Sequence, residues 1–381
     1  CLYSENNGVK NILYPDIANR RNYSYMSNIL IDIYIEIDII DEFKNVTKLP
    51  GKNLENILIG TIPIMVGSKY CMTTKYNKPL KCKYDIGGYF IINGSEKVIV
   101  SQEKRADNKI YICKNIKSQL KYSLIAEINS IDHSKISTPK TVSLKLLSKY
   151  ENKNLLKISI PNIKKDIPVF LVFYALGFTN NEELTNIILP DKNNPEYNKF
   201  LEFLKPSIEE SNDIDNQESA LYYISKSINI TSQTKDLMDN YDNITDVVIY
   251  ILKYEFLPHI GENFIKKKFF ICHMIYKLIL VHYKYNDYDD RDSYFNKRIN
   301  TPGILLASLF RQSFLKLIKD IKINKNKEFN NGSWRANENF HQIITKSNIY
   351  KIIKVNTIET GMKYALSTGN WGIKNSQNKQ G

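Results

Sequence analysis

The stretch YDIGGYFIINGSEKVIVSQEKRADN, residues 84–108, decides the fold of the first third of the chain. Within it, Asn93-Gly94 separates two runs that can form strands, and both residues tolerate the positive φ that a two-residue hairpin turn requires. Gly87-Gly88 bounds the first run on its other side, where glycine permits a turn. The stretch therefore predicts a β-hairpin whose Tyr-Phe-Ile-Ile arm is a buried strand.

Two further runs rich in β-branched residues precede this hairpin. Residues 28–43, NILIDIYIEIDIIDEF, alternate apolar and polar side chains with the period of two that marks a strand. The isoleucines of one face are Ile29, Ile31, Ile33, Ile35, Ile37 and Ile39, and the acidic residues of the other face are Asp32, Glu36 and Asp38. Residues 57–66 form the second run, so the first third is expected to be strand-rich.

Helices become frequent after two more expected strands, at 142–147 and 155–160. Residues 169–176 read as a buried helix that stops at Gly177, and helical periodicity recurs up to residue 260. The most apolar helix, 269–281, contains His273, Tyr276 and Lys277, and no run of about 18 apolar residues exists. Strands followed by helices predict an α+β protein without a membrane span.

Residues 303–322 are predicted to form an amphipathic helix. Its apolar side chains recur at spacings of three and four, which places them on one helical face. They are Leu306, Phe310, Phe314, Leu317 and Ile321. The basic residues of the opposite arc are Arg311, Lys316, Lys319 and Lys322. This pattern indicates one face packed on a core and one face in solvent.

Charge is distributed unevenly along the chain. The net charge of the 381 residues is +13, which favours a polyanionic partner, although positive charge also serves solubility. Residues 180–220 contain ten Asp or Glu and three Lys, a local net of −7. Residues 311–381 contain thirteen Lys or Arg and four Asp or Glu, a local net of +9. We therefore expect any nucleic acid to contact the C-terminal stretch.

The cysteine and histidine pattern predicts neither disulfides nor a zinc site. Five widely spaced cysteines without a Cys-x-x-Cys pair are typical of reduced thiols in an intracellular protein. A structural zinc site needs four ligands, and the spacing of Cys71 and Cys82 with His259 or His273 does not support one. The sequence also lacks a phosphate-binding Gly-x-x-x-x-Gly-Lys loop, a His-Glu-x-x-His pair and a Gly-x-Ser-x-Gly elbow.

One carboxylate cluster invites a metal interpretation, namely Asp287, Asp289, Asp290 and Asp292 in NDYDDRDSYF. An EF-hand loop needs Gly at its sixth position and Glu at its twelfth, and counting from Asp287 gives Asp292 and Arg298 instead. The alternative is a solvated loop with an arginine partner at the end of a helix. We expect this alternative, in which Asp290, Arg291 and Asp292 order a turn.

Several segments, in this order, resemble one protein family. They are IGTIPIMVGSKYCM (59–72), the 84–108 block, EFLPHI (255–260), DDRDSYFNKRINTPGILLASLFRQSF (289–314) and GMKYALSTGNWG (361–372). Together they resemble the second-largest, beta-like subunit of multisubunit DNA-directed RNA polymerases of eukaryotes, archaea and large DNA viruses. YPDIANRRNYSYMSNILIDI (14–33) also matches, except that Asn19 replaces a usual basic or apolar residue. The resemblance covers nearly the whole chain.

The resemblance implies an arrangement of domains. A mixed sheet-and-helix protrusion domain would comprise residues 1–125 and 266–310, and an inserted lobe domain would comprise 126–265. The acidic stretch would lie in the lobe, on a face turned away from DNA. Residues 311–381 would form a partly helical fork segment, with one loop near 330–354 and a second at 373–381. The start at Cys1 and the polar end at Gly381 predict a fragment of a longer chain, and the resemblance implies that it is an N-terminal part of the subunit.

The resemblance also implies where nucleic acid binds. The fork loops of the family approach the RNA–DNA hybrid and the melted DNA, so the polar residues of this stretch are the candidates. They are Lys346, Lys351, Lys354, Lys363, Asn370, Lys374 and Lys379. Trp371, between Asn370 and Gly372, is expected to anchor the core. Glu96 and Lys97 of the hairpin block could form an ion pair or contact a phosphate.

The activity implied is that of a DNA-directed RNA polymerase, a nucleotidyltransferase. In this family the catalytic magnesium is held by an Asp triad of the largest subunit, and the second subunit's zinc site lies beyond this chain. The chain alone is therefore expected to bind no cofactor and to be inactive. Its expected partners are the largest subunit, the rest of its own subunit, smaller subunits, template DNA and nascent RNA.

Two other functions remain open from the sequence. A stand-alone basic protein that coats single-stranded nucleic acid would show aromatic side chains interleaved with basic ones. A structural viral protein with incidental positive charge would leave the ordered blocks unexplained. The expected localisation is intracellular, either the nucleus or a viral factory or virion.

Overall fold

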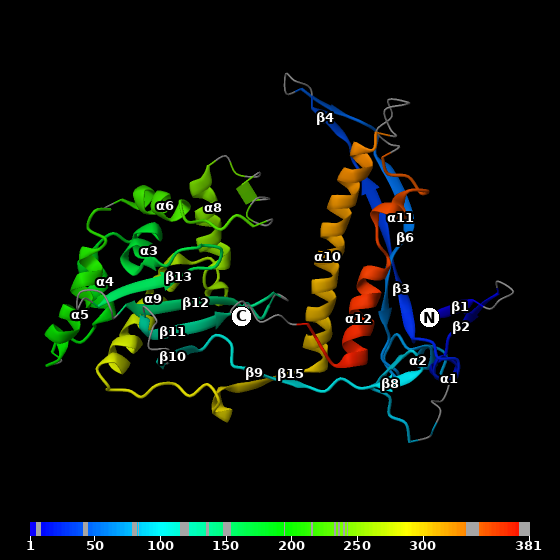
Figure 1. The fold of residues 1–381 in the computed structure, drawn as a ribbon, viewed down its shortest axis with the longest axis horizontal. Helices are drawn as coiled ribbons and strands as arrows, with labels where there is room; N and C mark the ends of the chain where they lie inside the picture. Colours follow the sequence, from blue (N-terminus) through cyan, green and yellow to red (C-terminus); the bar gives the residue numbers. More distant parts are fainter. Residues whose placement is uncertain are drawn as a thin grey trace. The chain divides into compact units, whose positions relative to one another are not determined.

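The computed structural model divides into two compact units, shown as a ribbon in Figure 1. Unit 1 comprises residues 1–102 and 299–381, and unit 2 comprises residues 103–298. The residues described are 1–4, 9–40, 45–77, 82, 84–114, 122–134, 137–147, 154–193, 195–214, 216–231, 234, 237–238, 241, 243–332 and 343–372. Helices and antiparallel strands occur in both units, which confirms the α+β class. The domain boundaries expected at 125, 265 and 310 stay a prediction.

Unit 1 consists of short β-hairpins and helices around a two-stranded antiparallel ribbon. Its strands are β1 (Leu2–Ser4), β2 (Lys10–Ile12), β3 (Met26–Ile35), β4 (Asp38–Ile40), β5 (Val46–Lys48), β6 (Lys52–Pro63), β7 (Phe90–Ile92) and β8 (Ser95–Lys97). Its helices are α1 (Pro15–Arg20), α2 (Met72–Lys75), α10 (Pro302–Asn330), α11 (Ile349–Ile352) and α12 (Asn356–Thr368). The long ribbon pairs β3 with β6.

The β3–β6 ribbon follows the expected alternation with one exception. Ile29, Ile33 and Ile35 pack against the core of unit 1, while Ile31 is 38 % exposed. The pairing register shifts on both sides of Ile31, and the Asn56 N–H donates to Asp32 Oδ1 at 2.8 Å. These bulges rotate the strand locally, so the prediction that Ile31 shares one face with Ile29, Ile33 and Ile35 is wrong.

The hairpin at residues 90–97 confirms the turn prediction. Asn93 and Gly94 have φ values of 49° and 76°, the left-handed conformation at both central turn positions. The three residues of β7 are buried. A Cβ on Gly94 would lie 2.7 Å from the Cα of Asn22, so only glycine fits where the turn meets this loop.

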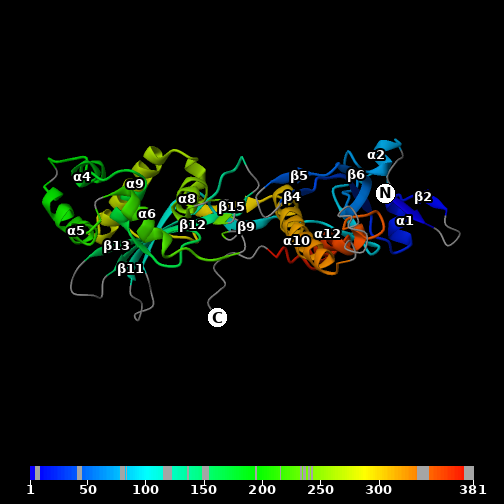
Figure 2. The same ribbon diagram turned by 90° about the horizontal axis from the view of Figure 1, so that it is seen from above.

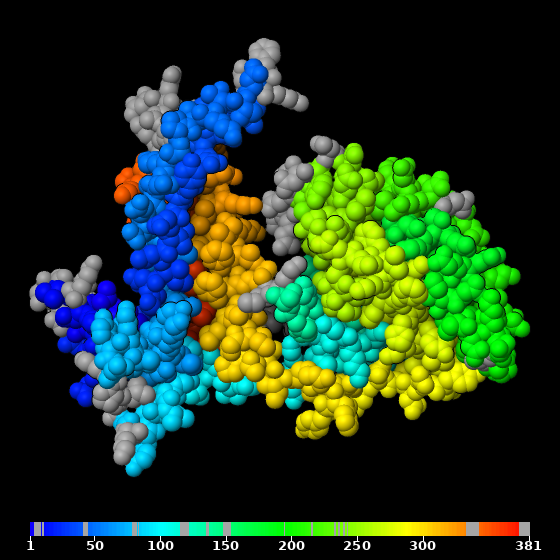
Figure 3. All heavy atoms as spheres, turned by 180° about the vertical axis from the view of Figure 1, so that it is seen from behind, coloured from blue at the N-terminus to red at the C-terminus, as the bar shows by residue number. Residues whose placement is uncertain are grey.

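Helix α10 extends beyond the predicted range of 303–322 in both directions. Its buried residues are Leu317, as predicted, and Leu305, Leu309 and Ser313, each one position before a residue of the predicted row. Leu306, Phe310, Phe314 and Ile321 pack beside them on the same core, and Arg311, Lys316, Lys319 and Lys322 are exposed, as predicted. In Figures 2 and 3, α10 lies alongside the blue strands of the ribbon.

Unit 2 contains a five-stranded antiparallel sheet in the order β10-β11-β12-β13-β14. Its strands are β10 (Ile110–Lys114), β11 (Tyr122–Ser130), β12 (Lys140–Leu147), β13 (Leu155–Ser159) and β14 (Ile167–Pro168). Its helices are α3 (Val169–Ala175), α4 (Asn181–Ile188), α5 (Tyr197–Glu209), α6 (Gln217–Ser225), α8 (Ile244–Tyr250), the π-helical turn η1 (Ile251–Glu255), the 3-10 turn η2 (Pro258–Ile260) and α9 (Phe264–His282).

The elements expected in this unit are confirmed. β12 and β13 occupy the two predicted strand segments, and α3 is buried along its whole length before Gly177 turns with a φ of 93°. Helix α9 contains the apolar segment 269–281 and packs into the core. No helix in the described ranges is long and apolar enough to cross a membrane.

Lys267 on α9 is a fully buried lysine. Its Nζ donates to the carbonyl oxygens of Leu252 at 2.7 Å and Lys253 at 2.8 Å. These carbonyls belong to η1, whose end is followed by Leu257 in a left-handed conformation with a φ of 51°. Burial lowers the pKa of the Lys267 ammonium to about 8, although Glu262 acts in the opposite direction. The ammonium therefore satisfies two carbonyls at the end of the π-helical turn.

The chain enters and leaves unit 2 on neighbouring strands. Strand β9 (Gln102–Arg105) follows the hairpin of unit 1, and β15 (Lys297–Asn300) follows the 3-10 turn η3 (Tyr294–Asn296). β9 pairs with β15 as a separate two-stranded sheet. The chain then continues from β15 directly into α10.

Candidate nucleic-acid interface

A groove on unit 1 is formed by α10, the α11–α12 segment and the residues after α12. Its volume is about 930 Å³. Its lining residues are Leu309, Gln312, Ser313, Lys316, Tyr350, Ile353, Lys354, Val355, Asn356, Thr357, Thr360, Gly361, Tyr364, Asn370, Trp371 and Gly372. The floor is apolar, and the polar side chains on it are amides, hydroxyls and two lysines.

Small residues allow α12 to pack closely between α10 and the β3–β6 ribbon. A Cβ on Gly361 would lie 2.6 Å from Ser313 Oγ of α10, and a Cβ on Gly60 of β6 would lie 3.1 Å from the Ile358 side chain of α12. Helix α12 ends at Gly369, whose φ of 73° turns the chain back toward the core. These contacts fix the helices that form the groove.

Trp371 anchors the segment after α12, as predicted. It is 7 % exposed and belongs to the core of unit 1. The neighbouring Asn370 is exposed, and its Oδ1 accepts a hydrogen bond from the Gly372 N–H at 3.1 Å. This turn holds Trp371 on the core of unit 1, while Asn370 and Gly372 beside it line the groove.

The electrostatic character of the groove is positive. Lys316 reaches it from α10 and Lys354 from the segment before α12. None of the described residues that line the groove is an Asp or Glu. A concave surface with cations and without carboxylates attracts anions, phosphates among them.

A smaller hollow of about 350 Å³ lies beside the end of α10. Its described lining consists of Asn324, Lys327, Glu328, Asn330, Asn331 and Lys351. Glu328 offsets part of the positive charge, and the C-terminal end of a helix carries a partial negative charge. This hollow is therefore a poorer anion site than the groove.

Only part of the predicted residue set comes together. Lys354 and Asn370 line the groove, Lys351 lines the smaller hollow, and Lys346 is exposed on the turn before α11. Lys374 and Lys379 lie outside the described residues. That any of them contacts nucleic acid stays a prediction.

Lys363 has a partner within the protein. Its ammonium pairs with Glu359 one turn earlier on α12, and Glu359 Oε2 also accepts from Thr61 Oγ1 of β6 at 2.8 Å. Burial of the Glu359 carboxyl would raise its pKa, but the bonds from Lys363 and Thr61 outweigh burial and leave the pKa below its ordinary value. This pair joins α12 to the ribbon, which makes Lys363 the least available of the candidate lysines that the structure describes.

Lys316, Tyr350 and Tyr364 are groove residues that the sequence prediction missed. Lys316 was assigned only to the solvent arc of α10, and the two tyrosines were not distinguished from the other tyrosines of the chain. No local signal in the sequence distinguishes them, because Lys316 and Tyr364 come together only where α10 packs against α12.

The aspartate cluster at 287–292 orders a turn in unit 2, as expected. Asp289 Oδ2 accepts from the Ile112 N–H at 2.8 Å, and Asp290 Oδ1 accepts from the Asp292 N–H at 2.8 Å. Among the described residues, no group of three or more His, Cys, Asp or Glu side chains could hold a metal ion. Arg291, the arginine predicted to pair with this loop, instead contacts a carboxylate outside the cluster.

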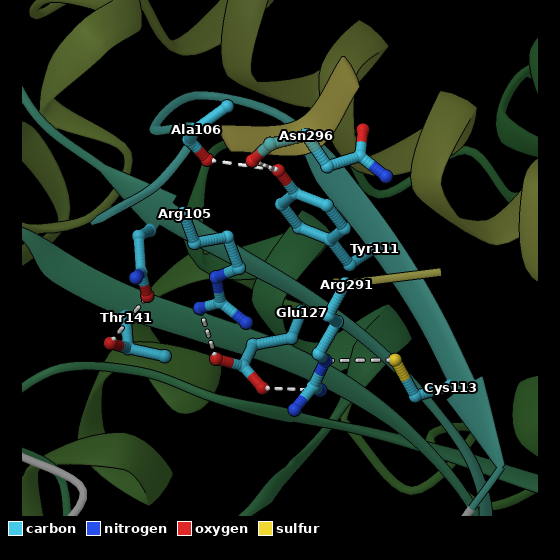
Figure 4. Close-up of polar contacts among 9 residues, drawn as sticks. Arg105, Ala106, Tyr111, Cys113, Glu127, Thr141, Arg291 and Asn296 are labelled. Atoms are coloured by element: carbon cyan, nitrogen blue, oxygen red, sulfur yellow. Dashed lines mark hydrogen bonds and ion pairs between the residues drawn. The ribbon is translucent and has the colours of Figure 1, made fainter. Parts of the chain in front are cut away.

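That carboxylate is Glu127 on β11, which receives two arginines (Figure 4). Arg105 Nη2 lies 2.8 Å from Glu127 Oε1, and Arg291 Nη2 lies 3.2 Å from Oε2. Arg291 Nε also donates to Cys113 Sγ at 3.0 Å, and the Arg105 guanidinium lies 5.0 Å from the centre of the Tyr111 ring. Glu127 therefore joins β9, through Arg105, and the 287–292 turn, through Arg291, to the five-stranded sheet.

The hairpin block has a similar structural contact. Asn19, the residue that departs from the expected pattern, donates through Nδ2 to Glu96 Oε1 at 3.1 Å. The Glu96 side chain thus ties the β7–β8 hairpin to the end of α1. This contact favours a structural role for Glu96.

Comparisons with known proteins place the chain in a family. The family "RNA polymerase beta subunit" matches residues 2–359. The chain is 35 % identical to the DNA-directed RNA polymerase II subunit RPB2 of Encephalitozoon cuniculi, covering 97 % of this chain and 30 % of that protein. It is 32 % identical to the DNA-directed RNA polymerase subunit 2 of Acanthamoeba polyphaga mimivirus, covering 98 % and 31 %.

A match to the archaeal DNA-directed RNA polymerase subunit Rpo2N of Halobacterium salinarum covers 96 % of this chain and 65 % of that protein at 26 % identity. The chain thus spans about 30 % of the length of the eukaryotic and viral relatives named above. With a family match over most of its length, the chain belongs to the RNA polymerase beta subunit family.

Proposed function

We propose that the chain is an N-terminal part of the second-largest subunit of a multisubunit DNA-directed RNA polymerase, and that its groove on unit 1 holds nucleic acid. Family membership supports the subunit assignment. The observation that carries the groove assignment is a lining with Lys316 and Lys354 and without a carboxylate among the described residues. In this proposal, 1–125 with 266–310 form the protrusion, 126–265 the lobe and 311–381 the fork.

The groove would contact the backbone of the nucleic acid rather than base edges. Lysine ammonium groups bind phosphate as point charges, and the amides and hydroxyls of Gln312, Asn356 and Thr360 can donate to phosphate oxygens. Such contacts carry no sequence information, as transcription of any gene requires. The role proposed is therefore to position DNA and the RNA–DNA hybrid.

The catalytic magnesium would belong to a different polypeptide. Two-metal nucleotidyl transfer needs clustered carboxylates, and the described residues offer no such cluster. We therefore propose that the largest subunit supplies the metal, that the chain alone is inactive, and that its partners are the largest subunit, the rest of the second subunit, smaller subunits, template DNA and nascent RNA. The compartment would be intracellular, either the nucleus or a viral factory or virion.

Affinity purification of the tagged chain from its own cells tests the assembly. We expect it to bring down a larger polypeptide with an Asp-rich metal loop, in an eluate that extends RNA on a primed template and requires Mg²⁺. The alternative, a stand-alone protein that coats single strands, predicts nucleic acid alone in the eluate after nuclease-free washing. That second result would refute the polymerase assignment.

Salt-dependent binding tests the groove. We expect Lys316→Ala combined with Lys354→Ala to weaken binding of a fluorescein-labelled oligonucleotide and to lower the slope of log affinity against log salt by about 1.4, at about 0.7 per lost single-strand contact. Lys319→Ala, an exposed lysine of α10 outside the described groove lining, is the matched control and should leave the slope nearly unchanged. Equal slopes for the double variant and the control would refute the groove assignment.

A further inference from the structure

The groove carries two half-exposed aromatic side chains whose role the proposed function leaves open. Tyr350 on α11 is 51 % exposed and Tyr364 on α12 is 56 % exposed, and both line the groove. The remaining aromatic residue of the groove, Trp371, is 7 % exposed and anchors the core. Two ring faces therefore stay available to a ligand in the groove.

Exposure alone does not identify these tyrosines as ligand contacts, because unit 1 exposes others. Tyr70 is 73 % exposed and Tyr84 is 85 % exposed, but neither lines the groove. Tyr350 and Tyr364 differ because they share one concavity with Lys316 and Lys354. Flat apolar rings and cations in one concave site are complementary to a ligand that has both flat faces and anionic charge.

We infer that the groove binds an unpaired stretch of nucleic acid, with Tyr350 and Tyr364 stacking on its bases and Lys316 and Lys354 contacting its phosphates. In a duplex the base faces are stacked on one another inside the helix, so they cannot meet a tyrosine ring. An unpaired strand presents both its bases and its phosphates, and base–aromatic stacking tolerates any sequence. The inference rests on the proposed function and specifies its ligand.

Three probes separate the contributions of bases and phosphates. The first is a labelled oligothymidylate of about 12 nucleotides, within the roughly 4–16 nucleotides that single-strand grooves take. The second is an abasic backbone of the same length, and the third is a duplex of that length. Each is titrated with the full chain, with binding followed by fluorescence anisotropy.

Tyr350→Leu with Tyr364→Leu removes the rings and keeps apolar bulk. We expect this double variant to bind the oligothymidylate roughly 5- to 150-fold more weakly per stacked base and the abasic backbone as well as wild type. Tyr350→Phe with Tyr364→Phe keeps the rings and should bind like wild type. Tyr70→Leu, an exposed tyrosine of unit 1 outside the described lining, should have no effect, and unchanged tryptophan fluorescence reports an intact unit 1.

The two proposals fail in distinguishable ways. If the lysine variants weaken binding of both single-stranded probes but the leucine variants weaken neither, the groove holds nucleic acid without stacking and the inference is overturned. If the leucine variants weaken duplex and single strand equally, the ligand class is wrong. If the lysine variants change nothing, both the groove assignment and the inference fall. Burial of both tyrosines against another polymerase segment, seen as protection from iodination without nucleic acid, also overturns the inference.

Discussion

Replacing the buried Lys267 should change how the stability of unit 2 depends on pH. The ammonium has a pKa of about 8 in the folded chain, against an ordinary value of 10.5. Between these two values the unfolded chain binds a proton that the folded chain has lost, so stability rises with pH. Because the shift is about 2.5 units at about 1.36 kcal/mol each, the full effect is about 3 kcal/mol.

The rise is confined to alkaline conditions. Below pH 8 the lysine is protonated in both states, and its contribution no longer changes with pH. Between pH 7 and pH 10 we expect the free energy of unfolding of wild type, relative to Lys267→Met, to increase by about 2.5 kcal/mol. Methionine has a similar length and no titratable group, so the difference between the two proteins cancels the titration of other residues.

The assay must report on unit 2 alone. Both tryptophans of the chain, at positions 334 and 371, fall in unit 1, so tryptophan fluorescence cannot follow the unfolding of unit 2. Urea titration with pulse proteolysis, quantifying the surviving 103–298 segment, gives the required free energy at each pH. Lys266→Met, an exposed lysine one residue away, is the control for the loss of a lysine. If the free energies of unfolding of wild type and Lys267→Met differ by the same amount at pH 7 and at pH 10, the reasoning is refuted.

Two further substitutions test the packing, one in each unit. Gly94→Ala should destabilise unit 1 by about 2–4 kcal/mol in urea titrations followed by tryptophan fluorescence, because its Cβ meets a backbone atom at 2.7 Å and its φ is positive. Gly88→Ala, with a positive φ but nothing within 4 Å, should cost only about 1–2 kcal/mol, and equal costs would contradict the clash. Glu127→Gln should destabilise unit 2 by about 1.5–3 kcal/mol by pulse proteolysis, because a nearly buried carboxylate loses two arginines. Glu103→Gln, whose carboxylate is 56 % exposed, should cost under about 1 kcal/mol, and a larger cost than that of Glu127→Gln would argue against the role of burial.

The elements predicted well were those whose signals are local. The Asn93-Gly94 turn depends on the φ preferences of two adjacent residues, and the core face of α10 depends on spacings within one helix. The Ile31 prediction failed because the bulges around it depend on the partner strand β6, where Asn56 pairs with Asp32. A period of two along one strand contains no information about an extra residue in its partner.

In the candidate interface, too, some residues could be predicted from their own segment and others only from the packing of two elements. Lys354 and Asn370 could be predicted because the family resemblance marks their segment, whereas Lys316 and Tyr364 meet only when α10 packs against α12. Lys267 lies in a run of three lysines, and nothing in that run indicates that Lys267 is the one with no exposed surface. Its burial depends on two carbonyls about fifteen residues earlier, in a turn that is not α-helical. Glu359 and Lys363, spaced by four on α12, are the exception, since their pairing could have been read from the helix.

Because β9 pairs with β15, the chain enters and leaves unit 2 at the same place. Its first and last residues lie on adjacent strands, so a tight two-residue turn such as Asn-Gly could connect them in place of nearly two hundred residues. Unit 1 would then consist of one continuous segment of chain, in which a β9–β15 hairpin leads directly into α10. The length of the chain between β9 and β15 can therefore change while the two strands that frame it stay paired.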